Sequence, residues 1–265
     1  MFYTPVALGY FFAGFFGLCV GSFLNVVICR VPKGESIVKP RSHCPQCDHL
    51  IAWYDNIPLL SFLVLKAKCR HCKTPIPIQY FGVELLTCLL SLLCYAWFHT
   101  LLLYFAWFCL LVAPLVAVIF IDLEHRIIPD SISLPGILAG VLVHFIDSPP
   151  DWEKQALIES GLGILAGGGF LFLIAWGYEK IKKREGLGGG DIKLAAMLGA
   201  FFGWQAVLMI LLMASILGSI IGLLVISIKK DWDYALPFGP FLAISAYLQL
   251  FLGQPILQWY LSLFH

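Results

Sequence analysis

The segment KIKKREGLGGGDIK (Lys180–Lys193) separates two long apolar stretches and places charged residues beside both of them. Basic residues end the first stretch, a glycine-rich run follows, and Asp191 stands where apolar sequence resumes at Ile192. An ionisable group beside hydrocarbon is costly and by default indicates function. The glycines permit another backbone to approach closely. The alternative for Asp191 taken alone is a helix N-cap, because aspartate caps helices well.

The composition is that of an integral membrane protein. Of the 265 residues, 60% are hydrophobic and only 12% are charged, whereas soluble domains carry about 25% charged residues. We predict an all-α polytopic membrane protein with about eight transmembrane segments. These are Val6–Cys29, Phe81–Phe98, Leu101–Ile121, Ser131–Ile146, Ala156–Tyr178, Ile192–Phe202, Trp204–Ile228 and Pro237–Tyr260.

The sixth predicted segment is short. At 1.5 Å per residue, Ile192–Phe202 spans roughly 16 Å, against a hydrocarbon core of about 30 Å. We therefore expect a partial or broken span there. Small-residue pairs such as Gly17 and Gly21 in the first segment, and Gly163 and Gly167 in the fifth, indicate close helix packing.

The basic residues predict the orientation. If residues 30–80 are placed inside the cell and eight segments follow, every lysine and arginine except Lys154 falls on or near the cytoplasmic side. This distribution satisfies the positive-inside rule. It predicts a multi-pass protein of the inner (cytoplasmic) membrane with both termini periplasmic. The net charge of +1 gives no indication of a nucleic-acid partner.

A polar insertion carries two pairs of cysteines. Cys44-Pro-Gln-Cys47 and Cys69-Arg-His-Cys72 lie in proline-rich sequence, a pattern that predicts a tetrahedral zinc site with four thiolate ligands. The alternatives are two local disulfides or four free thiols, and a cytoplasmic location disfavours disulfides. We expect the zinc to be structural, because a small loop-rich segment folds with the help of metal binding.

The insertion divides the chain into three predicted parts. Residues 1–29 form the first transmembrane segment, residues 30–80 the cytoplasmic zinc-binding insertion, and residues 81–265 a second transmembrane domain.

A second aspartate matches Asp191. The predicted topology puts Asp122, at the end of the third segment, at a similar depth on the cytoplasmic side. Two carboxylates within about 3–6 Å cannot easily both ionise, so one keeps a proton. Such a pair can activate water against a peptide carbonyl and protonate the leaving amine. We predict that Asp122 and Asp191 are the catalytic pair of an aspartic protease; the alternative for Asp122 is a pair with Arg126.

Other polar residues have structural interpretations. Asn25 is expected to make an interhelical hydrogen bond, and Asp130 after Pro129 to cap the fourth helix. Glu84 is expected to be an interfacial or cavity-facing carboxylate.

Two further functions were open on these residues. Intramembrane carboxylates also mark ion or proton paths, so an ion-coupled membrane carrier is an alternative. A zinc-bearing scaffold with incidental aspartates is another.

Several motifs in order resemble the bacterial type IV prepilin peptidases. The resemblance covers about Gly14 to Ala246. Its motifs are Gly21-Ser-Phe-Leu-Asn-Val-Val-Ile28 with Arg30 and Pro32, Arg41–Cys47, Trp53–Pro58, Lys68–Cys72, Pro75-Ile, Ile121–Asp130, Gly188–Leu194 and Pro237-Phe-Gly-Pro240.

This resemblance implies an eight-span aspartic protease of the GxGD type with Asp122 and Asp191 as its aspartates. It implies cleavage of the basic leader of type IV prepilins and type II secretion pseudopilins at the cytoplasmic membrane face. Members with the four-cysteine region commonly also N-methylate the new N-terminus with S-adenosylmethionine, so both activities are expected. No residue could be assigned to S-adenosylmethionine.

Overall fold

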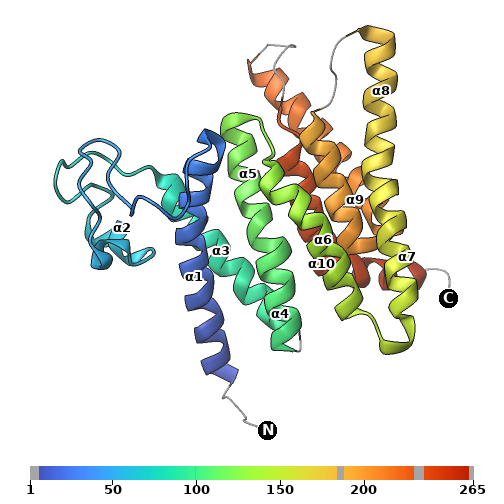
Figure 1. Ribbon diagram of the computed structural model, residues 1–265, viewed down its shortest axis with the longest axis horizontal. Coiled ribbons are helices and arrows are strands. Elements are labelled where there is room, and N and C mark those ends of the chain that lie inside the picture. The colour runs from blue at the N-terminus through green and yellow to red at the C-terminus, as the bar shows by residue number, and fades with distance from the viewer. Residues whose placement is uncertain (1–5, 99, 184–187, 230–235, 263–265) are drawn as a thin grey trace. The chain divides into compact units, whose positions relative to one another are not determined.

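The computed structural model describes residues 6–98, 100–183, 188–229 and 236–262. Within these ranges the chain is helical and has no strand beyond two isolated bridges, which confirms the predicted all-α class (Figure 1). Residues 184–187 of the glycine-rich segment lie outside the described residues. The chain forms two compact units: unit 1 is Met1–Ala117 and unit 2 is Val118–His265.

Six helical segments of the described chain are long and apolar enough to cross a membrane. Three of them are single helices: α3 (Ile78–Trp97), α6 (Asp130–Asp147) and α9 (Gly189–Lys229). The other three are continuous runs of shorter elements. The first run is α1 (Val6–Arg30) with η1 (Val31–Lys33), the second is α4 (Leu101–Trp107), η3 (Phe108–Val112) and α5 (Ala113–His125), and the third is η4 (Pro150–Trp152), α7 (Glu153–Ile164), η5 (Leu165–Gly169) and α8 (Phe170–Lys182). The remaining elements are η2 (Trp53–Asn56), α2 (Leu60–Val64) and α10 (Gly239–Ser262), whose apolar part Gly239–Gly253 is shorter.

The predicted sixth and seventh segments both lie in α9, and they are separated by a break. Gly203 leaves the helical conformation with φ 78° and ψ 176°. A residue with a side chain rarely adopts this backbone geometry, so glycine is required here. The break thus falls between the two segments that the sequence predicts, at the end of the short one.

Two side chains satisfy carbonyl groups at this break. A broken helix leaves carbonyl oxygens without their usual N–H partners, which is costly in hydrocarbon. Ser160 of α7 donates a hydrogen bond to the Ala200 carbonyl at 3.0 Å. His144 of α6 lies 2.9 Å, through its Nδ1, from the Phe201 carbonyl. Side chains of α6 and α7 thus stabilise the break in α9.

In unit 1, α1 packs closely against α3. A Cβ atom added at Gly17 would lie 2.9 Å from Cys88 Cα, and one added at Gly21 would lie 2.8 Å from Glu84 Cα. These distances are too short for a side chain, which confirms the packing role predicted for this pair. Asn25 donates from Nδ2 to the Tyr80 carbonyl at 3.1 Å, and this confirms its predicted interhelical hydrogen bond.

The polar insertion is tied to these two helices by buried polar groups. Arg30, at the end of α1, donates from Nη1 to the carbonyls of Ser36 at 3.0 Å and Pro40 at 2.9 Å. The Leu59 N–H donates to Glu84 Oε2 of α3 at 2.8 Å. The insertion is thus held on the ends of α1 and α3 at both its beginning and its middle.

Unit 2 is organised around α9, which α6, α7, η5 and α10 all contact. Gly163 has no room for a Cβ because the Gly199 backbone lies against it, and the Ala195 carbonyl does the same at Gly167. This confirms close packing at the second predicted glycine pair. The N-terminal half of α9 is buried from Leu194 to Phe201, so the start of this helix, where Asp191 lies, is held firmly.

Candidate active site and metal centre

The four predicted zinc ligands lie together in unit 1. The sulfur atoms of Cys44, Cys47, Cys69 and Cys72 are all within 4.8 Å of one another, and none is in a disulfide. Cys44 and Cys72 have their sulfurs 3.7 Å apart. A tetrahedral site with Zn–S bonds of about 2.3 Å requires sulfurs about 3.8 Å apart. The cluster therefore fits a zinc ion.

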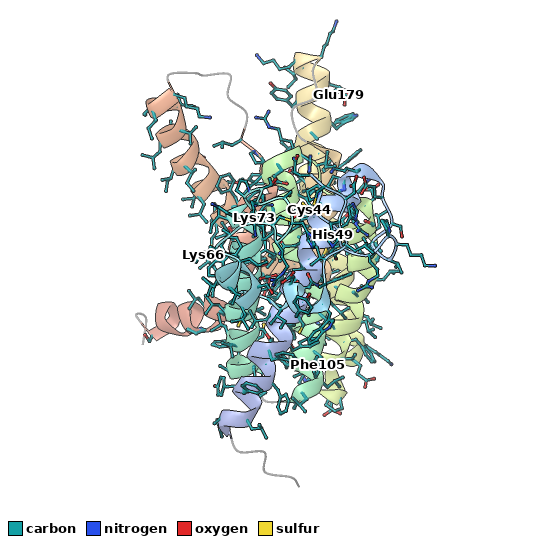
Figure 2. All side chains as sticks on the ribbon, turned by 90° about the vertical axis from the view of Figure 1, so that its left-hand side faces the viewer. Cys44, His49, Lys66, Lys73, Phe105 and Glu179 are labelled. Atoms are coloured by element: carbon teal, nitrogen blue, oxygen red, sulfur yellow. The ribbon has the colours of Figure 1, made fainter. Side chains whose placement is uncertain are left out.

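The two cysteine pairs occupy the same backbone turn, repeated. In each, the first cysteine donates its N–H to the carbonyl five residues later and accepts from the N–H four residues later. The bonds are Cys44 N–His49 O (3.0 Å), Asp48 N–Cys44 O (2.9 Å), Cys69 N–Thr74 O (2.9 Å) and Lys73 N–Cys69 O (3.1 Å). Figure 2 shows Cys44, His49 and Lys73 gathered together, whereas Phe105 of α4 lies apart from them. Two equivalent turns thus present four sulfurs to one point.

An ion pair braces the insertion beside the cluster. Arg70 donates from Nε to Asp55 Oδ2 at 2.7 Å and also bonds through Nη2 to Oδ1. This two-point bond to Arg70 lowers the pKa of the Asp55 carboxyl below its ordinary value. Asp55 is therefore ionised throughout the neutral pH range.

Asp122 lies in unit 2, in the last turn of α5, and is 4% exposed. Its Oδ2 accepts a hydrogen bond from the Gly239 N–H at 3.0 Å, at the start of α10. The two residues are 117 positions apart in sequence. A Cβ atom added at Gly239 would lie 2.6 Å from Asp122 Oδ2, which is too close for any side chain. Gly239 thus both orients this carboxylate and leaves room for it.

Asp191 lies in the first turn of α9. Its backbone N–H donates to the Gly188 carbonyl at 3.1 Å. Its Oδ1 is buried and has no hydrogen-bond partner among the residues that the structure describes. A buried oxygen of this kind is expensive and typical of functional sites. Asp191 is thus a half-buried residue whose buried Oδ1 is an acceptor that no described group uses.

The two aspartates are neighbours within unit 2. Their carboxylates are close enough to interact electrostatically. Ile128 links their surroundings: a Cβ at Gly190 would lie 2.9 Å from Ile128 Cβ, and one at Gly239 would lie 3.1 Å from Ile128 Cδ1. Because Gly190 and Gly239 have no side chains, the start of α9 and the start of α10 can both pack against Ile128.

One prediction in this region is wrong. Asp130 is not the N-cap of α6, because Pro129 holds that position and no side chain caps the helix. Lys193 Nζ instead contacts both Asp130 oxygens, at 2.7 Å and 2.8 Å. The Asp130 carboxylate is thus paired with the ammonium group of Lys193 on α9 and does not accept a hydrogen bond from the N-terminus of its own helix. The pair also ties the start of α6 to the start of α9, two residues beyond Asp191.

Sequence reasoning gave no role to Gly239 or Ile128. Each had only its place in a motif as a signal, Gly239 in Pro237-Phe-Gly-Pro240 and Ile128 in Ile121–Asp130. Glu84 was predicted to face an interface or a cavity, and the structure buries it to 8% exposure at the edge of a cavity in unit 1.

Comparison with known families matches both units. Residues 15–98 match the model of the bacterial peptidase A24 N-terminal domain, and residues 109–223 match that of the type IV leader peptidase family. No solved structure matches the chain.

Curated relatives carry one shared name, prepilin leader peptidase/N-methyltransferase. The protein of Aeromonas hydrophila is 36% identical over 94% of this chain and 92% of its own length, and that of Legionella pneumophila is 36% identical over 96% and 94%. The protein of Myxococcus xanthus is 47% identical over 79% of this chain, and the match spans 61% of that relative's length.

The fold and the comparisons define a multi-pass, all-helical membrane enzyme. The chain belongs to the type IV leader peptidase family. This membership favours a peptidase over the ion-coupled carrier that paired aspartates alone left open.

Proposed function

We propose that this enzyme removes the basic leader from type IV prepilins and pseudopilins and then N-methylates the new N-terminus, using Asp122 and Asp191 for the cleavage. The observation that carries the proposal is the electrostatic contact between Asp122 and Asp191, both inside the part of the chain that matches the leader peptidase model, with their neighbouring glycines Gly239 and Gly190 packed against Ile128. The shared name of the relatives supports both activities.

Cleavage follows from the pair of carboxylates. One holds a proton because two neighbouring carboxylates do not both ionise readily. The ionised carboxylate takes a proton from water, whose oxygen attacks the scissile carbonyl carbon. The other carboxyl donates its proton to the developing oxyanion. Collapse then breaks the C–N bond, and the amine leaves with a proton delivered by the pair. Gly239 keeps Asp122 in place for this step.

The chain crosses the membrane eight times in this proposal, with both termini periplasmic. The break at Gly203 divides α9 into a short and a long crossing, and α10 makes the last one. The end of α5 and the start of α9 then face the cytoplasm, where a basic leader and the first residues of an apolar helix meet the active site. The distribution of lysine and arginine supports this orientation.

The insertion of residues 30–80 is a structural zinc module between the first crossing and a peptidase part, residues 81–265. The zinc, when bound to Cys44, Cys47, Cys69 and Cys72, supplies folding free energy to a segment with little apolar core. The match between the repeated turns and tetrahedral geometry supports this role.

Methylation requires a neutral N-terminal amine. The lone pair of its nitrogen would accept the methyl group, and the proton that the nitrogen then loses would pass to water. S-adenosylmethionine, when bound, supplies the methyl group on a sulfonium that leaves as a neutral thioether.

Intact mass spectrometry tests the proposal. The purified protein in detergent is incubated with a peptide that has a basic leader followed by an apolar helix, with and without S-adenosylmethionine. The expected product has lost the leader mass and, with the donor, has gained one methyl group. The Asp191→Asn variant is the control, and it is expected to produce neither change.

Cleavage that continues in both Asp122→Asn and Asp191→Asn would refute the catalytic pair. Cleavage without methylation would limit the function to the peptidase. Substrate or proton flux into vesicles without any cleavage would instead support the carrier.

A further inference from the structure

Unit 1 contains a cavity that the peptidase chemistry does not use. It has a volume of about 530 Å³, which is in the range of small-molecule sites. One wall comes from α1 and α3, with Asn25, Tyr80 and Glu84, and the other comes from the insertion, with Ile57, Phe62 and Leu65. All of these residues lie far in sequence from Asp122 and Asp191.

Glu84 is the unusual member of this cavity. It is 8% exposed and lies on α3, inside a segment apolar enough to span a membrane. Its Oε2 accepts the Leu59 N–H at 2.8 Å. No ion pair joins Glu84 to a lysine or arginine within the described residues. A buried carboxylate without a cation is costly unless a ligand supplies one.

The backbone that reaches Glu84 is held in an uncommon conformation. Leu59 has φ 58° and ψ −47°, and this geometry aims its N–H at the carboxylate. A non-glycine residue in this region is strained, and such strain is typical of functional sites. The insertion is therefore shaped around Glu84, and the carboxylate is fixed at the cavity wall.

S-adenosylmethionine fits these surroundings chemically. It combines a flat aromatic adenine and a ribose with a sulfonium and an amino acid end that carries an ammonium and a carboxylate, so it needs apolar surfaces for the ring, polar partners for the hydroxyls and the carboxylate, and a carboxylate for the cationic groups. The cavity supplies apolar walls through Ile57, Phe62 and Leu65, and a carboxylate through Glu84. Its lining also contains Arg30 and Lys33, whose charge suits the donor's own carboxylate, and it reaches Cys44 and Cys69 of the four-cysteine cluster. We propose that this cavity in unit 1 is the S-adenosylmethionine site and that Glu84 contacts the cationic methionyl part of the donor. This inference rests on the proposed methyltransferase function and names the site for it.

Direct binding tests the site without using catalysis. Equilibrium dialysis of radiolabelled S-adenosylmethionine against the purified, zinc-loaded protein in detergent measures the affinity. Glu84→Gln keeps an oxygen that can accept the Leu59 N–H and removes the charge. Losing a charged contact is expected to weaken binding roughly tenfold to a hundredfold. Glu153→Gln, an exposed carboxylate of α7 in unit 2, is the matched control and is expected to bind as the wild type does.

A second test fills the cavity with a larger side chain and compares this variant with a control outside the cavity. Leu65→Trp adds bulk to the cavity wall and is expected to reduce binding, whereas Leu63→Trp changes an exposed neighbour outside the cavity and is expected to leave it unchanged. Zinc content and melting temperature, measured on all four variants, report whether each is folded. S-adenosylhomocysteine, which lacks the sulfonium charge, shows which cationic group Glu84 contacts. If Glu84 contacts the sulfonium, Glu84→Gln weakens the binding of S-adenosylmethionine more than that of S-adenosylhomocysteine. If Glu84 contacts the ammonium, the substitution weakens the binding of both ligands equally.

The outcomes separate this site from the function it serves. If the wild type binds and methylates but folded Glu84→Gln and Leu65→Trp bind equally well, the site is wrong and the methyltransferase stands. If Glu84→Gln leaves donor binding intact and raises only the KM for the peptide, the proposed ligand is wrong. If the wild type cleaves leaders yet neither binds the donor nor methylates, the methyltransferase function and its site both fail.

Discussion

The two sites of this protein are assembled in opposite ways. The four-cysteine site is made by short-range contacts: two turns of the same form, each closed by backbone hydrogen bonds four and five residues apart, present two sulfurs each. The aspartate site is made by long-range contacts, because Asp122 is oriented by a glycine 117 residues away and meets Asp191 through helix packing. The first site is a local structure that could hold a metal ion, and the second is a product of the whole of unit 2.

This difference predicts that the two sites fail separately and by different routes. Damage to the metal site should unfold a local segment and leave the aspartates in place. Damage to the aspartate site should remove chemistry without unfolding anything.

Cys44→Ser is expected to have the largest effect, on the insertion. Structural zinc contributes about 10–16 kcal/mol of binding free energy in small zinc domains, so losing a ligand should release the metal and unfold residues 30–80. Metal analysis should show loss of zinc, and methylation and folded yield should fall. Cys109→Ser, an exposed cysteine of η3 outside the cluster, is the control. Full zinc content and unchanged methylation in Cys44→Ser would refute a structural metal.

Asp122→Asn should abolish cleavage while leaving zinc content and melting temperature near those of the wild type. Removing a general acid or base costs about 10²–10⁴ in rate. Single-turnover assays with a prepilin peptide measure the loss. A variant that also lost its zinc would show that the two sites are not separable.

Gly239→Ala should reduce cleavage about a hundredfold, since a displacement of about 1 Å at a reacting group has that cost. The added Cβ would lie 2.6 Å from Asp122 Oδ2 and must move the carboxylate. The reduction should fall on kcat rather than KM, because Gly239 positions a reacting group. Gly177→Ala, where a Cβ would meet nothing within 4 Å, is the matched control. Equal activity of the two variants would contradict the positioning role.

Gly203→Ala should destabilise unit 2 by about 1–3 kcal/mol, because alanine is strained at a φ of 78°. The measurement is the midpoint of unfolding in detergent. Gly169→Ala lies in open space on a helical segment and should be neutral or slightly stabilising. A Gly203→Ala variant as stable as Gly169→Ala would mean that the break in α9 is not a fixed feature.

Asp55→Asn should have the smallest effect, a slight fall in melting temperature from the loss of the bond to Arg70. The sign follows from the lowered pKa of Asp55: the ion pair stabilises the folded state at any pH above the ordinary aspartate pKa of about 3.9, and the stabilisation is lost as the pH falls through the lower folded-state pKa. The difference between wild type and Asp55→Asn should therefore be constant from pH 8 to pH 5. A difference that fades between pH 6 and pH 5 would contradict the lowered pKa.

Local patterns made the helices and the metal ligands predictable. Apolar stretches of sufficient length must become helices in a membrane, because the backbone has no other way to satisfy its hydrogen bonds there. The spacing of Cys44, Cys47, Cys69 and Cys72 is enough to predict a four-sulfur cluster, since each pair folds within its own turn. The break at the end of Ile192–Phe202 was predictable because this apolar segment is too short to cross the hydrocarbon core.

The sequence by itself determined the class of protein, the helical segments, the four clustered cysteines and the two candidate aspartates. Only the tertiary structure decided that Gly239 holds Asp122, that Ile128 fills the space between the glycines of two segments, that Asp130 pairs with Lys193, and that Glu84 borders a cavity under the insertion. The physical reason is range. Periodicity, length and short spacings record what a residue does with its near neighbours, whereas a contact across more than fifty residues depends on how whole helices pack, and no local pattern records that.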